Sequence, residues 1–263
     1  MIRAGIGGWT FEPWRGTFYP DKLPAARELE YAASKLTSIE INGTFYRTQS
    51  PASFKSWAKQ TPDDFVFSVK AHRSAVNRKD LREAAESIEF FLKSGVTGLA
   101  EKLGPILWQM TPYKKFDADE FDAFFALLPE QYDGRTLRHA IEVRHASFAD
   151  AAFVELARKH NVAIVCVESD KHAPIADATA DFIYLRLEKT RAAEPTGYSK
   201  DELKTWLTRA RAWEKGETPK DLAQFSPAKK APPREVFAYF ISGAKERAPA
   251  AAMAFIALAD AKK

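Results

Sequence analysis

The run Val162-Ala163-Ile164-Val165-Cys166-Val167 decides the fold class of this chain of 263 residues. An uninterrupted apolar run of this kind is typical of a parallel strand that is buried on both faces. The residues before it have the i, i+3, i+4, i+7 spacing of one helix face: Phe153, Leu156, Ala157 and His160. Asn161 lies between the two and tolerates a left-handed turn. The stretch therefore predicts a helix, a tight turn and a buried parallel strand.

The same alternation of helical spacing and short apolar runs occurs about eight times along the chain. The expected strands are 3–9, 38–42, 65–70, 106–110, 139–143, 162–167, 182–187 and 236–240. Each unit averages roughly 33 residues, close to the ~30 residues of a β-α-β unit. We therefore predict one (β/α)8 TIM-type barrel domain over residues 1–263. A doubly wound open sheet would need fewer strands or a second domain, and no linker divides the chain.

Three further segments show the helical spacing. They are Leu29, Ala32, Ala33 and Leu36; Phe121, Phe124, Phe125 and Leu128; and Leu203, Trp206, Leu207 and Ala210. Ser199 and Glu202 form a capping box at the start of the last of these, and Gly216 is placed to end it. The segment 217–234, rich in Pro and Lys, is interpreted as a solvated loop at the N-terminal face of the barrel.

The composition is that of an ordinary globular protein, with 46% hydrophobic and 28% charged residues. No run approaches the ~18 apolar residues of a membrane span, and the first residues lack the regions of a signal peptide. Cys166 is the single cysteine, which excludes an internal disulfide. We therefore expect a soluble cytoplasmic protein without a membrane partner. The net charge of +4 favours a small anionic partner over a dedicated nucleic-acid surface.

In a β/α barrel, catalytic groups come from the C-terminal ends of the strands and from the loops after them. The segment 141–145 is the strongest candidate, because alternation along a strand places Glu142 and Arg144 on the same side. We predict that Glu142 carries a proton, that His145 assists near neutral pH and that Arg144 binds an anion. The alternative is a structural Glu142–Arg144 ion pair at the barrel mouth, with His145 capping the next helix.

Other polar residues end neighbouring strands. Glu40 and Asn42 share one side of their strand, and Glu40 lies between two isoleucines, where it either pairs with a cation or has a raised pKa useful for catalysis. Lys70 is a candidate base, Schiff-base amine or anion anchor, with a surface-directed lysine as the alternative. Arg186 suits phosphate or carboxylate binding, or a structural pair with a glutamate. Gln109 completes the polar substrate-binding set.

Trp9 and Trp14 in the first loop are candidates for stacking on a sugar or base, or for packing over the barrel mouth. No cofactor is expected, because the sequence has no Gly-rich phosphate loop and no His-Glu-x-x-His or Gly-x-Ser-x-Gly motif. A divalent metal is a disfavoured alternative, so we assign no metal ligands. It would require four glutamates to converge: Glu40, Glu142, Glu168 and Glu188.

Motifs over nearly the whole chain carry a family resemblance. They are Gly7-Gly8-Trp9, Trp14-Arg15-Gly16-Thr17-Phe18-Tyr19-Pro20, Glu40-Ile41-Asn42-Gly43-Thr44-Phe45-Tyr46-Arg47, Trp57-Ala58 with Thr61-Pro62, Phe67-Ser68-Val69-Lys70, Leu103-Gly104-Pro105 with Gln109, Glu142-Val143-Arg144-His145 with Phe148, and Tyr184-Leu185-Arg186. With these motifs the chain resembles the YecE-like family, also called domain of unknown function 72. The resemblance implies a TIM-type barrel, and it implies no activity.

Three pairs of residues depart from the usual pattern of that family. Val76-Asn77 stand in place of Thr-His, Glu188-Lys189 in place of His-Gly, and Ile241-Ser242 in place of two asparagines. These positions would face a shared pocket, so the substrate or the chemistry is expected to differ from that of the main family. The retained polar residues are Glu40, Asn42, Lys70, Gln109, Glu142, Arg144, His145 and Arg186.

Three functions are compatible with these residues. The favoured one is an enzyme that applies acid–base chemistry, with hydrolysis slightly preferred, to a small anionic or phosphorylated metabolite. The second is a repair-type nuclease or a nucleic-acid binder, based on the basic balance and the aromatic first loop. The third is a ligand-binding barrel without catalysis, suggested by the altered positions. For the favoured function we expect one cavity at the C-terminal face to receive Glu40, Lys70, Glu142, Arg144 and Arg186. The oligomeric state has no signal in the sequence.

Overall fold

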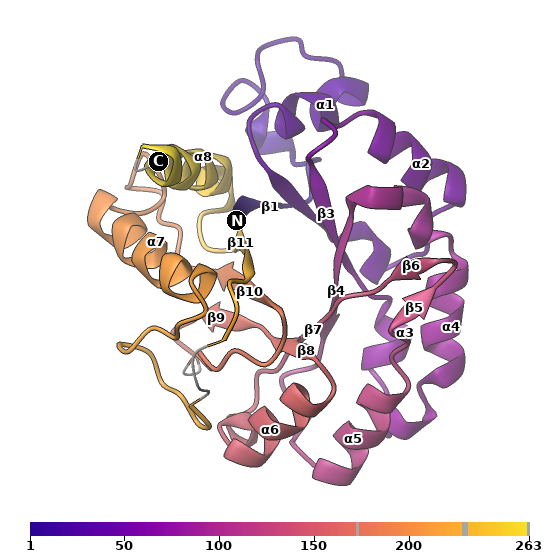
Figure 1. Ribbon diagram of the computed structural model, residues 1–263. Helices are drawn as coiled ribbons and strands as arrows, with labels where there is room; N and C mark the ends of the chain where they lie inside the picture. Colours follow the sequence, from indigo (N-terminus) through magenta and orange to yellow (C-terminus); the bar gives the residue numbers. More distant parts are fainter. Residues whose placement is uncertain (172–173, 228–230, 262–263) are drawn as a thin grey trace.

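Nine short strands form one parallel sheet that curves around a central axis (Figure 1). The computed structural model describes residues 1–171, 174–227 and 231–261. The strands of this sheet are β1 (Ile2–Gly7), β2 (Ser38–Ile41), β3 (Val66–Lys70), β4 (Leu103–Gln109), β7 (His139–Glu142), β8 (Val162–Ile164), β9 (Cys166–Glu168), β10 (Phe182–Leu187) and β11 (Glu235–Phe240). Every neighbouring pair in the sheet is parallel.

The barrel closes through one interrupted strand. β8 and β9 are two halves of a single predicted strand and meet at Val165, whose N–H donates to the Ile141 carbonyl at 2.9 Å. β8 pairs with β7, whereas β9 pairs with β10 on the other side. The strand order β8-β7-β4-β3-β2-β1-β11-β10-β9 therefore returns to the same stretch of chain. Taken as one strand, β8 and β9 complete the eight-stranded barrel, and the predicted fold is confirmed.

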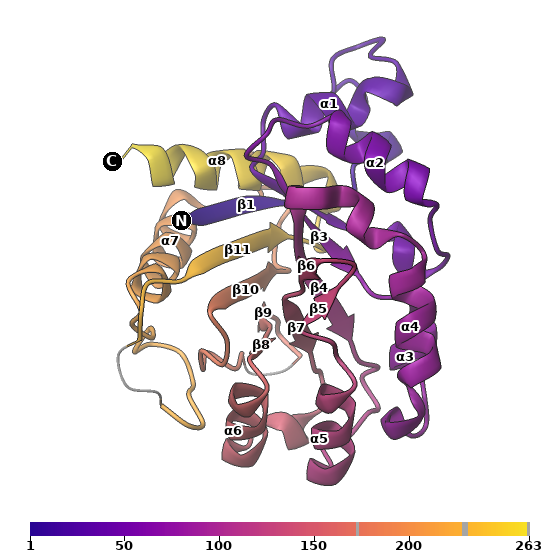
Figure 2. The same ribbon diagram turned by 45° about the vertical axis from the view of Figure 1, so that its right-hand side comes forward.

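Helices lie on the outside of the barrel (Figure 1, Figure 2). The α-helices are α1 (Glu28–Ala33), α2 (Pro51–Lys59), α3 (Arg73–Val76), α4 (Ala85–Lys93), α5 (Ala118–Ala126), α6 (Ala151–Lys159), α7 (Lys200–Glu214) and α8 (Ala248–Asp260). The 3-10 helices are η1 (Glu12–Trp14), η2 (Ala25–Arg27), η3 (Gly43–Phe45), η4 (Leu81–Glu83), η5 (Val96–Lys102), η6 (Ala146–Phe148) and η7 (Lys245–Arg247). Within the described ranges, none of the helices has the length and apolar character required to cross a membrane.

The predicted helix boundaries around α6 and α7 are confirmed. Ser199 and Glu202 form the capping box at the start of α7, with both reciprocal hydrogen bonds present. Gly216 follows that helix with a φ of 79°, and a Cβ on it would lie 1.8 Å from the Ala231 carbonyl oxygen. Only glycine fits this position. Asn161 has a φ of 50° and makes the left-handed turn between α6 and β8.

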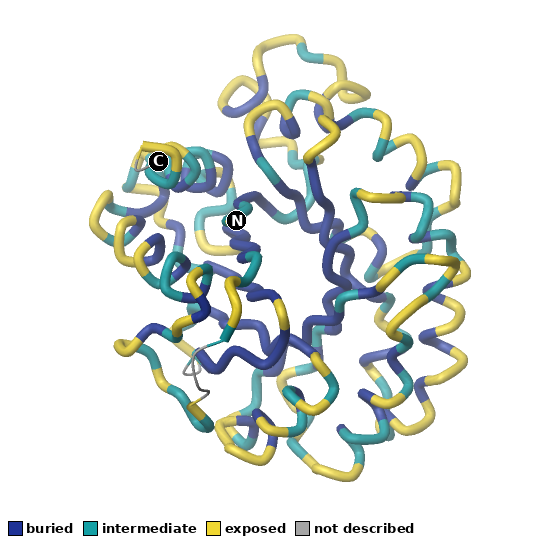
Figure 3. The backbone as a smooth tube through the Cα atoms, in the orientation of Figure 1, coloured by how far each residue is buried: buried dark blue, intermediate teal, exposed yellow. Residues whose placement is uncertain are grey.

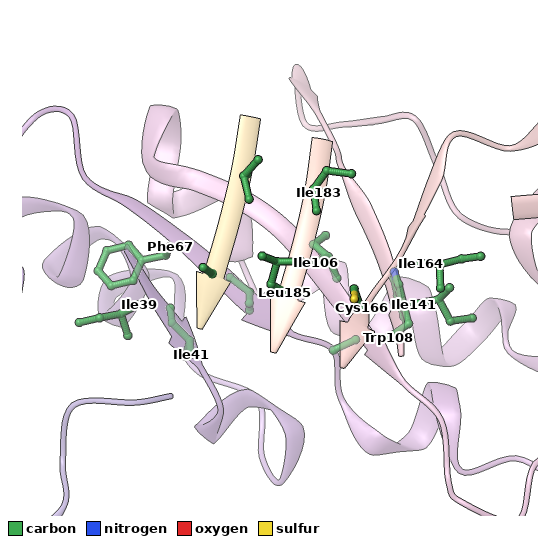
Figure 4. Packing of buried hydrophobic residues seen from close by; sticks show 14 of the residues in the cluster. Ile39, Ile41, Phe67, Ile106, Trp108, Ile141, Ile164, Cys166, Ile183 and Leu185 are labelled. Atoms are coloured by element: carbon green, nitrogen blue, oxygen red, sulfur yellow. The ribbon is translucent and has the colours of Figure 1, made fainter. Parts of the chain in front are cut away.

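The strands separate two apolar regions. Side chains that point outward pack beneath the helices, among them Ile39, Phe67, Ile106, Ile141 and Leu185 (Figure 4). Side chains that point inward fill the barrel, among them Val66, Leu107, Ala140, Phe182, Tyr184, Phe237 and Tyr239. The strands are thus buried on both faces (Figure 3), which is why their sequences are continuous apolar runs.

Two connections have features that the sequence interpretation does not include. β5 (Gln131–Tyr132) and β6 (Arg135–Thr136) form an antiparallel hairpin whose turn, Asp133-Gly134, has positive φ at both residues. Asp-Gly is a favourable pair for such turns. The segment 217–234 is a loop, as predicted, over its described residues 217–227 and 231–234, nearly all of them exposed or half-buried, but it is anchored at one point. There the buried carboxylate of Asp177 accepts hydrogen bonds from the N–H groups of Phe225 and Ser226, at 2.8 and 2.9 Å.

Candidate functional site

The inward-facing side chains become charged toward the C-terminal ends of the strands. On β10, every second side chain points inward: the apolar Phe182 comes first, then the phenol of Tyr184, and then Arg186. Other strands end in the same way, with Glu40 on β2, Lys70 on β3 and Glu142 on β7. Arg186 and Lys70 are only 3% and 8% exposed, and both carboxylates are fully buried. A layer of buried charges thus lies above the apolar interior.

Arg186 is the centre of this layer. Its Nε and Nη2 donate to the two carboxylate oxygens of Glu40, both at 3.2 Å. Its Nη1 donates to Glu142 Oε2 at 2.6 Å and to Glu188 Oε1 at 3.3 Å. Burial disfavours the guanidinium, but the carboxylates of Glu142 and Glu40 outweigh it and raise the pKa of Arg186 above its usual value. The arginine is therefore a permanent cation held in one orientation.

Both oxygens of Glu142 are occupied by hydrogen-bond donors. Besides Arg186, Gln109 Nε2 donates to Oε2 at 2.8 Å and Arg144 Nε donates to Oε1 at 2.7 Å. Burial opposes ionisation, but Arg186 and Arg144 outweigh it and lower the pKa of Glu142 to about 2. A carboxylate with this pKa is a weak base at neutral pH. The geometry suits Glu142 to holding Arg186 in place.

Phenols and hydroxyls support the layer from below. The Tyr184 hydroxyl donates to Glu40 Oε2 at 2.7 Å. The Tyr239 hydroxyl lies 2.6 Å from Ser38 Oγ and 2.5 Å from Ser68 Oγ, in the centre of the barrel. Buried polar groups are tolerated where they find such partners. Glu40 is thereby fixed between Arg186 and Tyr184.

A cavity of about 690 Å³ opens at the C-terminal ends of β1, β2, β3, β10 and β11. Its wall contains five aromatic side chains: Trp9, Trp14, Tyr46, Trp57 and Phe240. Four lining side chains carry positive charge, namely Arg47, Lys70, Arg186 and Lys245. None of the described residues that line it is acidic. The cavity is therefore electropositive, while the carboxylates Glu40 and Glu142 lie behind Arg186.

Lys70 occupies an unusual position in this wall. Its Nζ lies 4.1 Å from the centroid of the Phe45 ring. Burial disfavours the charged ammonium of Lys70, and the nearby cation Arg186 disfavours it further. The carboxylate of Glu40 favours the ammonium but does not outweigh these effects, so the pKa of Lys70 falls to about 8. Lys70 can therefore exchange a proton near neutral pH. Asn42, also predicted as a binding residue, lines the same cavity.

Close backbone packing shapes the cavity. A Cβ on Gly7 would lie 2.7 Å from both Asn42 Nδ2 and Ile241 Cδ1, so glycine lets these side chains approach the first strand. Ser242, which follows the neighbouring strand β11 and lines the same cavity, has a φ of 75°, which is strained for a residue with a side chain. Its carbonyl accepts a hydrogen bond from Thr190 Oγ1 at 2.6 Å. Such strain is common at binding and catalytic sites.

Several predicted residues lie away from the cavity wall. Glu40, Gln109, Glu142, Arg144 and His145 do not line it, so of the five residues expected to share one cavity only Lys70 and Arg186 do. Arg144 and His145 border a smaller cavity of about 160 Å³. His145 Nδ1 accepts from the Ser147 N–H at 3.1 Å and so caps η6. Trp14 lines the larger cavity but is also core, since it is 1% exposed and donates to the Lys245 carbonyl at 3.1 Å.

Some lining residues are absent from the sequence-based site. Tyr46, Arg47 and Trp57 lie within motifs that carry the family resemblance, which gives no reason to single them out. Lys245 follows Ser242 by three residues, as the first residue of η7, and its Nζ lies 4.4 Å from the Phe11 ring centroid. The rule that strand ends carry the site extends to Lys245 only if the three residues after Ser242 are counted with the strand end.

The four glutamates considered for a metal are engaged elsewhere. Glu40, Glu142 and Glu188 all contact Arg186. Glu168 instead accepts hydrogen bonds from Tyr198 and, at 2.8 Å, from Trp206 Nε1. Within the described part of the chain, no group of three or more His, Cys, Asp or Glu side chains is arranged to hold a metal ion. Of the three altered pairs, Ile241-Ser242 line the cavity and Glu188 contacts Arg186, whereas Val76 is buried in α3.

Known proteins match this architecture. The DUF72 family protein of Thermotoga maritima MSB8 has a crystal structure that matches with a TM-score of 0.76, 24% identity and 99% coverage of both chains. A crystal structure of the DUF72 family protein of Enterococcus faecalis V583 gives a TM-score of 0.75 at 16% identity, covering 99% of this chain and 96% of that one. At these identities the likeness shows a shared fold.

Sequence comparison leads to the same family. The UPF0759 protein YunF of Bacillus subtilis (strain 168) is 25% identical over 160 residues, which are 59% of this chain and 55% of that protein. The match thus spans about half of the length of that relative. The family described as "Protein of unknown function DUF72" matches residues 3–263. The predicted resemblance is confirmed, and the chain belongs to the DUF72 family.

Proposed function

We propose that this protein is an enzyme that binds a small organic anion at the mouth of its barrel and uses Lys70 to transfer protons there. One observation carries the proposal: four cationic side chains line the cavity, and its described wall has no carboxylate. An electropositive concave site attracts anions and binds phosphate or carboxylate groups. The site lies at the C-terminal ends of the strands, where barrel enzymes place their catalytic groups.

Arg186 is suited to bind the anion. Four of its five N–H groups are used by Glu40, Glu142 and Glu188, which leaves one on Nη2 for a ligand in the cavity. Because these carboxylates already fix the guanidinium, little ordering is needed when a ligand binds. Glu40 and Glu142 act in this proposal through Arg186 and do not themselves touch the substrate.

Lys70 is the residue best suited to proton transfer. General acid–base catalysis is most efficient when the pKa of the group lies near the working pH, and the pKa of Lys70 is about 8. Hydrolases, lyases and isomerases all use such a group. In this arrangement Lys70 replaces Glu142 as the proton carrier, since the low pKa of Glu142 suits it to anchoring.

The proposal is tested by anion binding. The purified chain is titrated with inorganic phosphate, sugar phosphates and small carboxylic acids, with melting temperature and calorimetry as readouts. We expect at least one anion to bind, and Arg47→Met and Lys245→Met to weaken it by about tenfold or more, as for a lost charged hydrogen bond. The matched control is Lys204→Met, an exposed lysine of α7 that pairs with Asp201.

Two results would contradict the proposal: no anion binds, or the cavity variants bind as well as the wild type. The role of Lys70 is tested with the variant Lys70→Arg, using whichever anion binds to the wild type. This variant keeps the positive charge but cannot lose a proton near neutral pH. We expect this variant to retain anion binding and to lose turnover. Binding without turnover in the wild type would instead support a ligand-binding barrel.

A further inference from the structure

We infer that Lys70 forms an imine with its substrate, and that the substrate is a small aldehyde or ketone bearing a carboxylate or phosphate group. The inference rests on the proposed anion binding at this cavity. It assigns Lys70 a covalent role in place of proton transfer alone, and it adds the class of substrate. It also selects lyase-type reactions, which use an imine as an electron sink, over the hydrolysis that the sequence favours.

Lys70 differs from Lys102 and Lys114, two other shielded lysines of the chain, whereas the less buried Lys245 on the same cavity likewise has only ring contacts at its Nζ among the described residues. Lys102 Nζ donates to the carbonyl oxygens of Ala58 and Thr61, both at 2.7 Å, and Lys114 pairs with Glu120 at 2.5 Å. For Lys70 Nζ, the described residues supply neither a hydrogen bond nor an ion pair.

The surroundings of Lys70 favour the neutral amine. The side chain is 8% exposed and belongs to the wall of the cavity. A buried ammonium without hydrogen-bond acceptors is costly. The charged groups nearest to it oppose one another, with Glu40 and Glu142 favouring the ammonium and Arg186 and Arg144 disfavouring it. Burial decides the balance, and the pKa of Lys70 is lowered to about 8. The neutral amine is the form that attacks a carbonyl carbon.

Arg186 defines the rest of the substrate. It lines the same cavity as Lys70, and its remaining N–H on Nη2 is free to bind an anion. A substrate that reaches both residues carries its anionic group close to its carbonyl. A guanidinium binds a carboxylate or a phosphate equally well in this position. Asn42, on the same wall, is a hydrogen-bonding partner for a substrate hydroxyl.

The proposed step is balanced without a further reagent. The nitrogen lone pair of neutral Lys70 forms a bond to the carbonyl carbon, and the C=O π electrons move to oxygen. One proton passes from nitrogen to that oxygen, and a second, supplied by solvent, lets the oxygen leave as water. The product is a protonated imine, whose positive charge withdraws electrons from the neighbouring carbon. Adding a hydride donor converts it irreversibly to a secondary amine.

The experiment is reductive trapping on the full chain. Glyoxylate, pyruvate or glyceraldehyde 3-phosphate is added with sodium cyanoborohydride at pH 7, and the adduct is located by mass spectrometry of peptides. We expect one probe to label Lys70 at least about tenfold faster than any exposed lysine, because the lowered pKa of Lys70 leaves more of its amine neutral. Inorganic phosphate should slow this labelling by occupying the anion site.

Matched variants separate the possible outcomes. Lys70→Met should remove the fast adduct, and Lys204→Met should retain it. Circular dichroism checks that each variant is folded. If Lys70→Met is not folded, Lys70→Arg is used in its place. Labelling spread over exposed lysines, or unchanged in the Lys70 variant, would overturn the inference. Equal labelling of Lys70 by uncharged acetaldehyde would overturn the anionic substrate class. If phosphate binds and no adduct forms, the imine is excluded and the anion-binding function stands.

Discussion

Arg186 on β10 and Glu142 on β7 meet inside the barrel, with Nη1 of the arginine 2.6 Å from Oε2 of the glutamate. Their strands are not neighbours, because the interrupted strand formed by β8 and β9 lies between them. The ion pair therefore bridges the place where the barrel closes. Both side chains are buried, so each depends on the other to offset the cost of its own charge.

Removing either partner of this pair should destabilise the protein strongly. Arg186→Met or Glu142→Gln leaves a buried charge without its partner, and we expect each to cost about 3–5 kcal/mol of the free energy of unfolding. The double variant should lose less than the sum of the two. Arg144→Ala should cost much less, because its side chain is 33% exposed. Urea unfolding compares the wild type with all four variants, and an equal loss for Arg144→Ala and Arg186→Met would contradict this account.

His139 should make the protein sensitive to mild acid. Its Nδ1 accepts from Trp108 Nε1 at 3.1 Å, its Nε2 donates to the Pro129 carbonyl at 2.9 Å, and burial lowers its pKa to about 4. Between pH 6.5 and 4 the unfolded chain binds a proton that the folded chain excludes. Stability should therefore be complete above pH 6.5 and fall toward pH 4, by roughly 3 kcal/mol at most.

The measurement compares urea unfolding of the wild type and His139→Gln at pH 7 and pH 4.5. Glutamine does not titrate in this range, so the advantage of the wild type over the variant should shrink at the lower pH. A difference that stays constant between the two pH values would show that His139 is not the source of the acid sensitivity.

Gly7→Ala should damage ligand binding more than stability. The new Cβ would lie 2.7 Å from Asn42 Nδ2 and from Ile241 Cδ1, both of them ends of side chains that can move. Movement of Asn42 changes the shape of the cavity without breaking the sheet. We expect phosphate binding to fall by about tenfold, as for one lost polar contact, while the melting temperature changes little. Gly98→Ala, which lies outside the cavity wall and where a Cβ would come no closer than 3.2 Å to the atoms of another residue, is the control for a substituted glycine.

The fold could be predicted because its signals are local. Each strand is buried on both faces, so its sequence is a continuous apolar run, and the bounds of β10 agree with the predicted 182–187. The interruption at Val165 could not be predicted, because the residues on both sides are equally apolar. It depends on how the sheet closes, which involves strands from distant parts of the chain.

The site could be predicted only in part. The charged residues at strand ends follow from the geometry of parallel barrels, so Glu40, Lys70, Glu142 and Arg186 could be named from the sequence. Which of these side chains reach the cavity and which lie beneath them could not be predicted. That depends on Arg186, a long side chain from β10 that covers the carboxylates Glu40 from β2 and Glu142 from β7. Lys245 begins η7, whose position after the last strand is set by tertiary packing.

Lys70 should make the protein less stable than it would be with an apolar residue at this position. At pH 7 folding buries an ammonium that has no hydrogen-bond acceptor among the described residues. Lys70→Met removes that charge and keeps a similar length, so we expect the variant to be more stable than the wild type at pH 7. Residues kept at a cost to stability are typical of functional sites.

The pH dependence of this difference identifies Lys70 as its cause. The pKa of Lys70 is about 8 in the folded chain and 10.5 in the unfolded one. Between these values the unfolded state holds a proton that the folded state has lost, so wild-type stability should rise with pH, by roughly 3 kcal/mol at most. Below pH 8 the contribution is constant. Urea unfolding at pH 7.5, 8.5 and 9.5 should show the wild type gaining on Lys70→Met at each step. Lys204→Met, which retains Lys70, should show the same change of unfolding free energy with pH as the wild type. If the difference in unfolding free energy between the wild type and Lys70→Met does not change with pH, the amine of Lys70 keeps its ordinary pKa.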